Sequence, residues 1–81
     1  MTNTITSLSD RELQMLRMVA VGKTNSEIAY ATCISAQTVK HHVASILRKL
    51  SAVDRTHAVV VALRDGLITM DELDEVERQA A

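Results

Sequence analysis

The chain has 81 residues, enough for one small domain that buries only about 60% of the surface of its unfolded chain. It has no Pro, Phe or Trp, one Tyr and one Cys, which argues against a β-sandwich, aromatic platforms for single-stranded nucleic acid, and disulfide or cysteine-rich zinc frameworks. The net charge is −1, but residues 1–65 hold eight Lys and Arg against five acids, whereas residues 66–81 hold one Arg against five acids. A mildly basic body with an acidic tail is still compatible with a nucleic-acid partner.

The first two predicted helices both begin at a capping box. Ser9 and Glu12 have the S-x-x-E pattern, and apolar residues then recur at helical spacing up to the first of the two glycines. Thr24 and Glu27 repeat the pattern and begin a short second helix. Residues 1–7 are polar and are predicted to form a disordered leader.

The third predicted helix spans residues 36–51 and is capped by Ser35. One face carries a continuous apolar stripe, formed by Val39, Val43, Ile46, Leu47 and Leu50. The opposite face is polar or small and is formed by Gln37, Lys40, His41, Ala44 and Arg48. No acidic residue occurs from 36 to 53, which is what a surface that meets phosphates requires.

The fourth predicted helix begins at Asp54 and ends near Asp65. Its run from Ala58 to Leu63 is apolar on every side, and a buried β-strand is the alternative interpretation of so many valines. The Asp54 cap favours a helix, which must then bury two faces. We expect one face to pack on the core and the other to meet the same helix of a second subunit, unless the acidic tail covers it.

The last segment, residues 67–81, is predicted to form an acidic helix that begins at a third capping box, Thr69 and Glu72. Three interpretations stay open for this segment. It could extend a dimer interface, place its acids near the basic face, or pack against the fourth helix.

The sequence resembles the LuxR/GerE-type, NarL-like helix-turn-helix domain of bacterial transcription regulators. The resemblance covers residues 8–66 and rests on five motifs in the order and spacing of that family. They are LSDRELQML at 8–16, GKTNSEIA at 22–29, ISAQTVKHHV at 34–43, ILRKL at 46–50 and DRTHA at 54–58. The resemblance implies an all-α fold of four helices, in which the second and third form the helix-turn-helix, here followed by a short C-terminal acidic helix.

The resemblance also assigns roles to individual residues. Together with the exposed face of the third helix, it predicts base readout by Gln37, Lys40, His41 and Ala44. It predicts contact with phosphates by Thr24, Asn25, Thr38, His42, Arg48 and Lys49. It implies a dimer through the fourth helix, with an interface predicted at Val59, Val60, Leu63 and Leu67.

The chain departs from the family pattern at several positions. Thr32 stands where Leu is usual, Ser51 where Gly is common, and Ala52 where Val is common. Only seven residues precede Leu8, so a receiver or ligand-binding domain has no room here. We therefore expect a stand-alone regulator, with a fragment as the alternative.

The sequence gives no support for metal binding, a cofactor or catalysis. His41 and His42 point about 100° apart on a helix and His57 lies on another, so no metal site, cofactor or catalytic set is predicted. Cys33 is expected to be a small apolar filler. No signal peptide or membrane-spanning run is present, so a cytoplasmic, nucleoid-associated protein is expected.

The sequence thus predicts a non-enzymatic, dimeric regulator of transcription that binds double-stranded DNA with the third helix in the major groove. Further partners would be RNA polymerase or a related regulator. The alternative is an anti-activator that forms a heterodimer with a related regulator and blocks its DNA binding, as the net charge and acidic tail would allow. The operator, the regulated genes, the sign of regulation and any signal input do not follow from the sequence.

Overall fold

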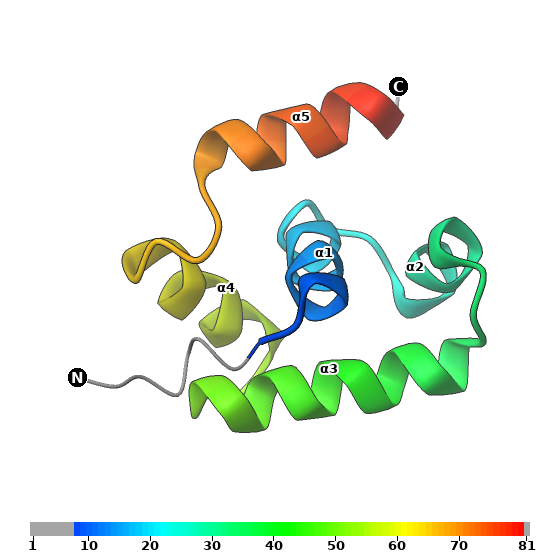
Figure 1. Ribbon diagram of the computed structural model, residues 1–81, viewed down its shortest axis with the longest axis horizontal. Coiled ribbons are helices and arrows are strands. Elements are labelled where there is room, and N and C mark those ends of the chain that lie inside the picture. The colour runs from blue at the N-terminus through cyan, green and yellow to red at the C-terminus, as the bar shows by residue number, and fades with distance from the viewer. Residues whose placement is uncertain (1–7, 81) are drawn as a thin grey trace.

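The computed structural model describes residues 8–80, which form five helices and contain no strand (Figure 1). The helices are α1 (Asp10–Ala20), α2 (Asn25–Thr32), α3 (Ala36–Leu50), α4 (Arg55–Arg64) and α5 (Met70–Ala80). The predicted all-α fold of four helices and an acidic C-terminal helix is confirmed, and α3 ends one residue earlier than predicted. The predicted disordered leader, residues 1–7, lies outside the described residues.

Local side-chain bonds explain where the helices begin. In three of them a hydroxyl accepts the N–H of a glutamate three residues on, and that glutamate accepts the hydroxyl residue's own N–H. These reciprocal pairs are Ser9–Glu12, Thr24–Glu27 and Thr69–Glu72. At the other two starts, Ser35 Oγ accepts the N–H of Thr38 at 3.0 Å and Asp54 Oδ1 accepts that of His57 at 2.8 Å. All five starts agree with the sequence prediction.

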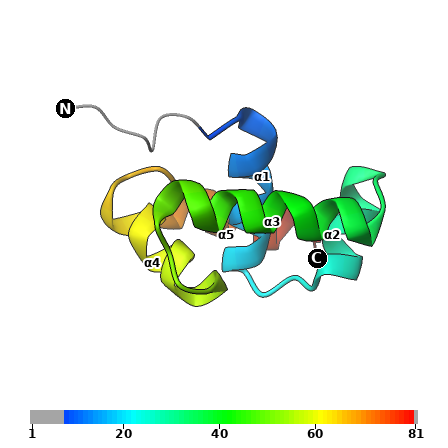
Figure 2. The ribbon, with the colours of Figure 1, turned by 90° about the horizontal axis from the view of Figure 1, so that it is seen from below.

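The core gathers around α1, which packs against α3, α4 and α5. Seen from two directions, α3 and α5 lie on opposite sides of α1 (Figures 1 and 2). The largest fully buried side chains come from α1, α2 and α3 and from the α4–α5 connection, and they are Met15, Leu16, Ile28, Val39, Ile46 and Ile68. The apolar stripe of α3 therefore faces inward, which fixes the opposite face of α3 outward.

The apolar run of α4 is helical, so the alternative of a buried strand is wrong. Ala58, Val61 and Ala62 are buried in the core, whereas Val60 points outward and is 51% exposed. Asp54 caps the helix as predicted, and its hydrogen bond outweighs the weak preference of valine for strands.

The acidic tail packs mainly on α1, so the interpretation that it packs on the fourth helix, one of the three left open, is wrong. Ile68 and Leu73 are buried, and Glu72 forms an ion pair with Arg17 of α1 at 3.5 Å. Because α5 lies across the molecule from α3, the interpretation that placed its acids near the basic face is also wrong (Figure 1). In this position the tail does not cover Val60 of α4.

Ser51 ends α3 in the left-handed region of backbone space, with a φ of 55°. Its N–H bonds back to carbonyls of the last turn. A residue without Cβ adopts this conformation most easily, so Ser51 is less favourable here than the Gly that the resemblance leads us to expect.

Candidate nucleic-acid interface

The connection between α2 and α3 is a tight turn of three residues, 33–35. Cys33 ends α2 in the left-handed conformation with a φ of 59°, and the N–H of Ile34 bonds to the carbonyl of Ala29. Ser35 then caps α3. The two helices pack against each other, so this turn fixes the angle at which α3 is presented.

Cys33 is exposed, so the prediction that it fills a gap in the apolar interior is wrong. The apolar position at this turn is taken by Ile34, which packs against the core. Periodicity cannot show this, because a left-handed cap turns the chain out of the helical register.

The outward face of α3 consists of the five residues that the sequence predicted. Gln37, Lys40, His41, Ala44 and Arg48 are all exposed. The face lies along one edge of the molecule, with no helix packed over it (Figures 1 and 2).

The charge of this face is positive. Helix α3 contains no carboxylate, and within residues 8–80 neither Lys40 nor Arg48 forms an ion pair with an acid of another element. The N-terminal turn adds free backbone N–H groups and the positive end of the helix dipole. The surface therefore attracts a polyanion, and Lys40 and Arg48 are available to contact it.

Two of the exposed side chains contact each other one turn apart. Nε2 of Gln37 lies 3.2 Å from Nε2 of His41, close enough for a hydrogen bond in which the amide donates to a neutral ring nitrogen. Such a bond restrains both side chains and leaves the Gln37 carbonyl oxygen directed elsewhere. The pair thus presents a defined pattern of donors and acceptors.

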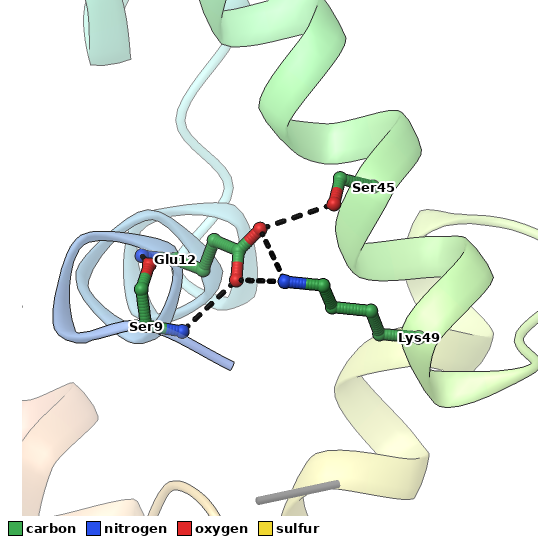
Figure 3. A network of polar contacts seen from close by, with 4 residues as sticks. All are labelled: Ser9, Glu12, Ser45 and Lys49. Carbon is green, nitrogen blue, oxygen red and sulfur yellow. Dashed lines mark hydrogen bonds and ion pairs between the residues drawn. The ribbon is translucent and has the colours of Figure 1, made fainter. Parts of the chain in front are cut away.

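A buried carboxylate ties α3 to α1. Glu12 is only 5% exposed, and its oxygens accept from Lys49 Nζ at 3.0 and 3.3 Å and from Ser45 Oγ at 3.1 Å (Figure 3). The backbone N–H of Ser9 donates to the same carboxylate at 2.9 Å. The contact fixes the rotation of α3 about its own axis, and therefore which side chains face outward.

Burial and three polar contacts act in opposite directions on the charge of Glu12. Burial raises the pKa of its carboxyl, but the N–H of Ser9, the ammonium of Lys49 and the hydroxyl of Ser45 outweigh burial and hold the pKa below its ordinary value of 4.5. Glu12 is therefore ionised at neutral pH, and the contact with Lys49 is an ion pair.

A second brace joins α4 to the start of α2. Arg55 donates from Nη1 to Oδ1 of Asn25 at 2.7 Å and from Nη2 to the carbonyl of Lys23 at 3.0 Å. The side-chain oxygen of Asn25 is thus engaged within the molecule, and its amide N–H groups remain as the donors that could meet a phosphate.

The residues predicted to contact phosphate are in different environments. Arg48 is exposed, whereas His42 is half-buried. Thr24 caps α2, and Thr38 shares a hydrogen bond with Ser35 at 2.9 Å. Lys49 lies on the α1 side of α3 with Glu12, so the structure gives it a bracing role.

Sequence reasoning missed the two braces. Glu12 was predicted only as a capping residue, and Ser45 and Arg55 received no role. Their partners lie 30 to 37 residues away in the chain, and no spacing rule connects positions that distant.

The part of the chain that the structure describes contains neither a candidate metal site nor a helix that could span a membrane. Among residues 8–80, no three side chains of His, Cys, Asp or Glu gather closely enough to hold a metal ion. None of the five helices is long and apolar enough to cross a membrane.

A tight turn between α2 and α3, a buried stripe on α3 and a basic outward face define a helix-turn-helix domain of the DNA-binding class. The model of the bacterial regulatory proteins of the luxR family matches residues 6–62, and the chain belongs to that family. It is therefore a DNA-binding domain of the kind found in transcriptional regulators.

Several curated proteins are similar to this chain over 61 residues. The response regulator protein VraR of Staphylococcus aureus (strain Mu3) is 48% identical there, and the VraR proteins of Staphylococcus saprophyticus and Staphylococcus epidermidis match equally well. The match covers 75% of this chain but only 29% of each relative. The chain therefore spans less than a third of the length of these relatives.

Proposed function

We propose that this chain is a sequence-specific regulator of transcription that binds double-stranded DNA as a homodimer, with α3 in the major groove. The observation that carries the proposal is the outward face of α3, which is exposed, free of carboxylates and braced from behind by the Glu12–Lys49 ion pair. The major groove of B-form DNA is wide enough to admit such a helix. A cytoplasmic location at the nucleoid and contact with RNA polymerase belong to the same proposal.

Four residues of α3 are assigned to the base edges. Lys40 donates to the O6 and N7 acceptors of guanine, and Gln37 can pair with adenine through its amide. His41 orients Gln37 and offers its own ring, and Ala44 can contact the methyl group of thymine.

Contacts with phosphates position the helix. Arg48 is the exposed cation assigned to this task, together with the polar groups at the starts of α2 and α3. The remaining proposed phosphate contacts are Thr24, Asn25, Thr38, His42 and Lys49. Lys49 would reach a phosphate only by sharing its ammonium with Glu12.

The proposed dimer is formed by the outward side of α4 and by Leu67, three residues beyond the end of that helix. Val60 is exposed, and Val59, Leu63 and Leu67 are half-buried beside it. Two copies joined here by a twofold axis would read inverted half-sites about 10 base pairs apart, one helical turn of DNA.

Selection of bound duplexes from a random pool tests the proposal. We expect an inverted repeat to be enriched, and Lys40→Ala to lose roughly 1–3 kcal/mol of discrimination at one base position in each half-site. Arg78→Ala serves as the matched control, because Arg78 is an exposed cation on α5 and lies on neither α3 nor α4, and it should leave the selected sequence unchanged.

Two results would contradict the proposal. Enrichment without any inverted repeat would remove the dimer. No binding to any duplex at low salt would favour an anti-activator, which would instead abolish the DNA binding of a related regulator added to the same assay.

A further inference from the structure

Helices α1, α2 and α5 enclose an open groove of about 600 Å³ on the side of the molecule away from the outward face of α3. Its apolar lining comes from all three helices, namely Met18, Tyr30, Ala31 and Val76. Polar and charged side chains complete the lining, namely Lys23, Ser26, Glu27 and Gln79. An apolar lining with a polar margin is the composition of a protein-binding surface.

The groove exists because α5 docks on α1. Ile68 and Leu73 are buried under it, and the ion pair between Glu72 and Arg17 fixes its position. Helix α5 lies beyond residues 6–62, which the family model matches. The groove is thus an addition to the helix-turn-helix module.

Tyr30 is the most exposed large hydrophobic side chain of the described residues, at 90%, and it is the sole Phe, Tyr or Trp of the chain. Nothing in the fold requires an aromatic ring at that position of α2, because the ring contributes almost nothing to the core. Rigid amphipathic rings are enriched at the energetic centres of protein interfaces.

We propose that the groove binds an amphipathic helix of a partner protein, with the apolar face of that helix on Tyr30 and Val76 and with basic residues beside it. The charge argument comes from α5, which carries five acids against one arginine. The helix contributes Val76 and Gln79 to the lining, so its acids act from beside the groove and not from within it. A partner with Lys or Arg at the margin is attracted to that helix. A second copy of this chain would place two acidic α5 helices together, and their repulsion disfavours self-association there.

The position of the groove relative to α3 has a functional consequence. Because α3 and α5 lie on opposite sides of α1, a protein held in the groove leaves the outward face of α3 open (Figures 1 and 2). The groove also reaches the start of α2, where Lys23 and Ser26 of its lining flank Thr24 and Asn25, so a bound protein leaves α3 free but adjoins the proposed phosphate contacts of α2. Binding there does not require the DNA readout proposed above, so each proposal can fail without the other.

Amide chemical-shift mapping of the ¹⁵N-labelled full chain tests the groove. The probes are two peptides of about 14 residues, four turns of helix, which share a Leu face and differ in having only Lys or only Glu at the other positions. We expect the Lys peptide to shift the amides of residues 26–31 and 76–79. The Glu peptide should bind at least roughly tenfold more weakly, a difference of about 1.4 kcal/mol.

Two substitutions distinguish binding in the groove from non-specific binding of the peptide elsewhere on the surface. Tyr30→Ser should weaken binding of the Lys peptide roughly tenfold without loss of stability, since the ring is solvent-exposed. Met70→Ser is the control, because Met70 is 61% exposed on α5 and does not line the groove.

Four outcomes would overturn the proposal. They are peptide-induced shifts concentrated outside the groove, equal binding of both peptides, equal effects of Tyr30→Ser and Met70→Ser, and an absence of binding. Shifts of the groove amides that depend on the concentration of the chain alone would show that a second copy occupies it instead.

Discussion

At the scale of single residues, Glu12 has two structural roles, and only one of them is visible in the sequence. Its role in the capping box is visible three residues from Ser9, but the same carboxylate also accepts from Lys49 and Ser45 of α3. A carboxylate that is buried and has several donors is costly to alter, because each donor would lose its partner. Glu12 is therefore the residue on which the orientation of α3 most depends.

The first prediction concerns the pH dependence of stability. The pKa of Glu12 is lower in the folded chain than its ordinary value of 4.5, so its stabilising contribution is complete above that value and is lost as the pH falls through the folded pKa. We expect Glu12→Gln to lower the free energy of unfolding by about 1–3 kcal/mol at neutral pH and by less in acid. Urea denaturation across that range measures the difference.

The control for this prediction is Glu77→Gln, which removes an exposed carboxylate of α5. It should change stability by less than about 0.5 kcal/mol. A Glu12→Gln difference that stayed constant down to the lowest pH would show that the charge of Glu12 contributes nothing.

At the scale of helices, local chemistry decided what the sequence could predict. The five helix starts depend on side chains within three residues of the cap, so Ser35 and Asp54 could be recognised without a structure. The outward face of α3 followed from the period of its apolar stripe. The turn at Cys33 and the partner of α5 were not predictable, because they depend on packing between helices.

The second prediction concerns α4. Val60→Asp places a charge on the outward side of this helix without disturbing the buried Ala58, Val61 and Ala62. If α4 forms the proposed dimer, burying that charge at the interface is unfavourable, and we expect binding to an inverted repeat to weaken at least tenfold, about 1.4 kcal/mol. Sedimentation equilibrium of the variant with and without duplex measures the loss.

Val53→Asp is the matched control for assembly in the absence of duplex, because Val53 is an exposed valine that precedes α4, although it lies beside Lys40 and Ala44 of α3. Its assembly should equal that of the parent chain. An unchanged dimer in Val60→Asp would place the twofold contact elsewhere.

At the scale of the whole molecule, basic and acidic surfaces are separated by α1. The sequence showed the charge asymmetry, but only the fold shows that the acidic α5 sits across the molecule from α3 (Figure 1). The net charge of −1 consequently does not describe the surface that DNA would meet. The acidic helix α5 and the DNA-facing helix α3 can therefore act independently of each other.

The third prediction tests that separation. Leu73 is buried where α5 meets α1, and Leu73→Ala should lower the free energy of unfolding by about 2–4 kcal/mol. Its DNA affinity, measured at a temperature where the variant is fully folded, should stay within about twofold of the parent chain, because α3 is not touched. A selective loss of DNA affinity in the folded variant would show that α5 supports the reading helix.

The central claim is that the outward face of α3 is the surface that meets DNA. Amide chemical-shift mapping of the labelled chain with a selected duplex tests it most directly. The account predicts that the largest shifts fall in α3, from Gln37 to Arg48, and at the start of α2, with little change along α5. Largest shifts along α5 or α4, with α3 unperturbed, would contradict it.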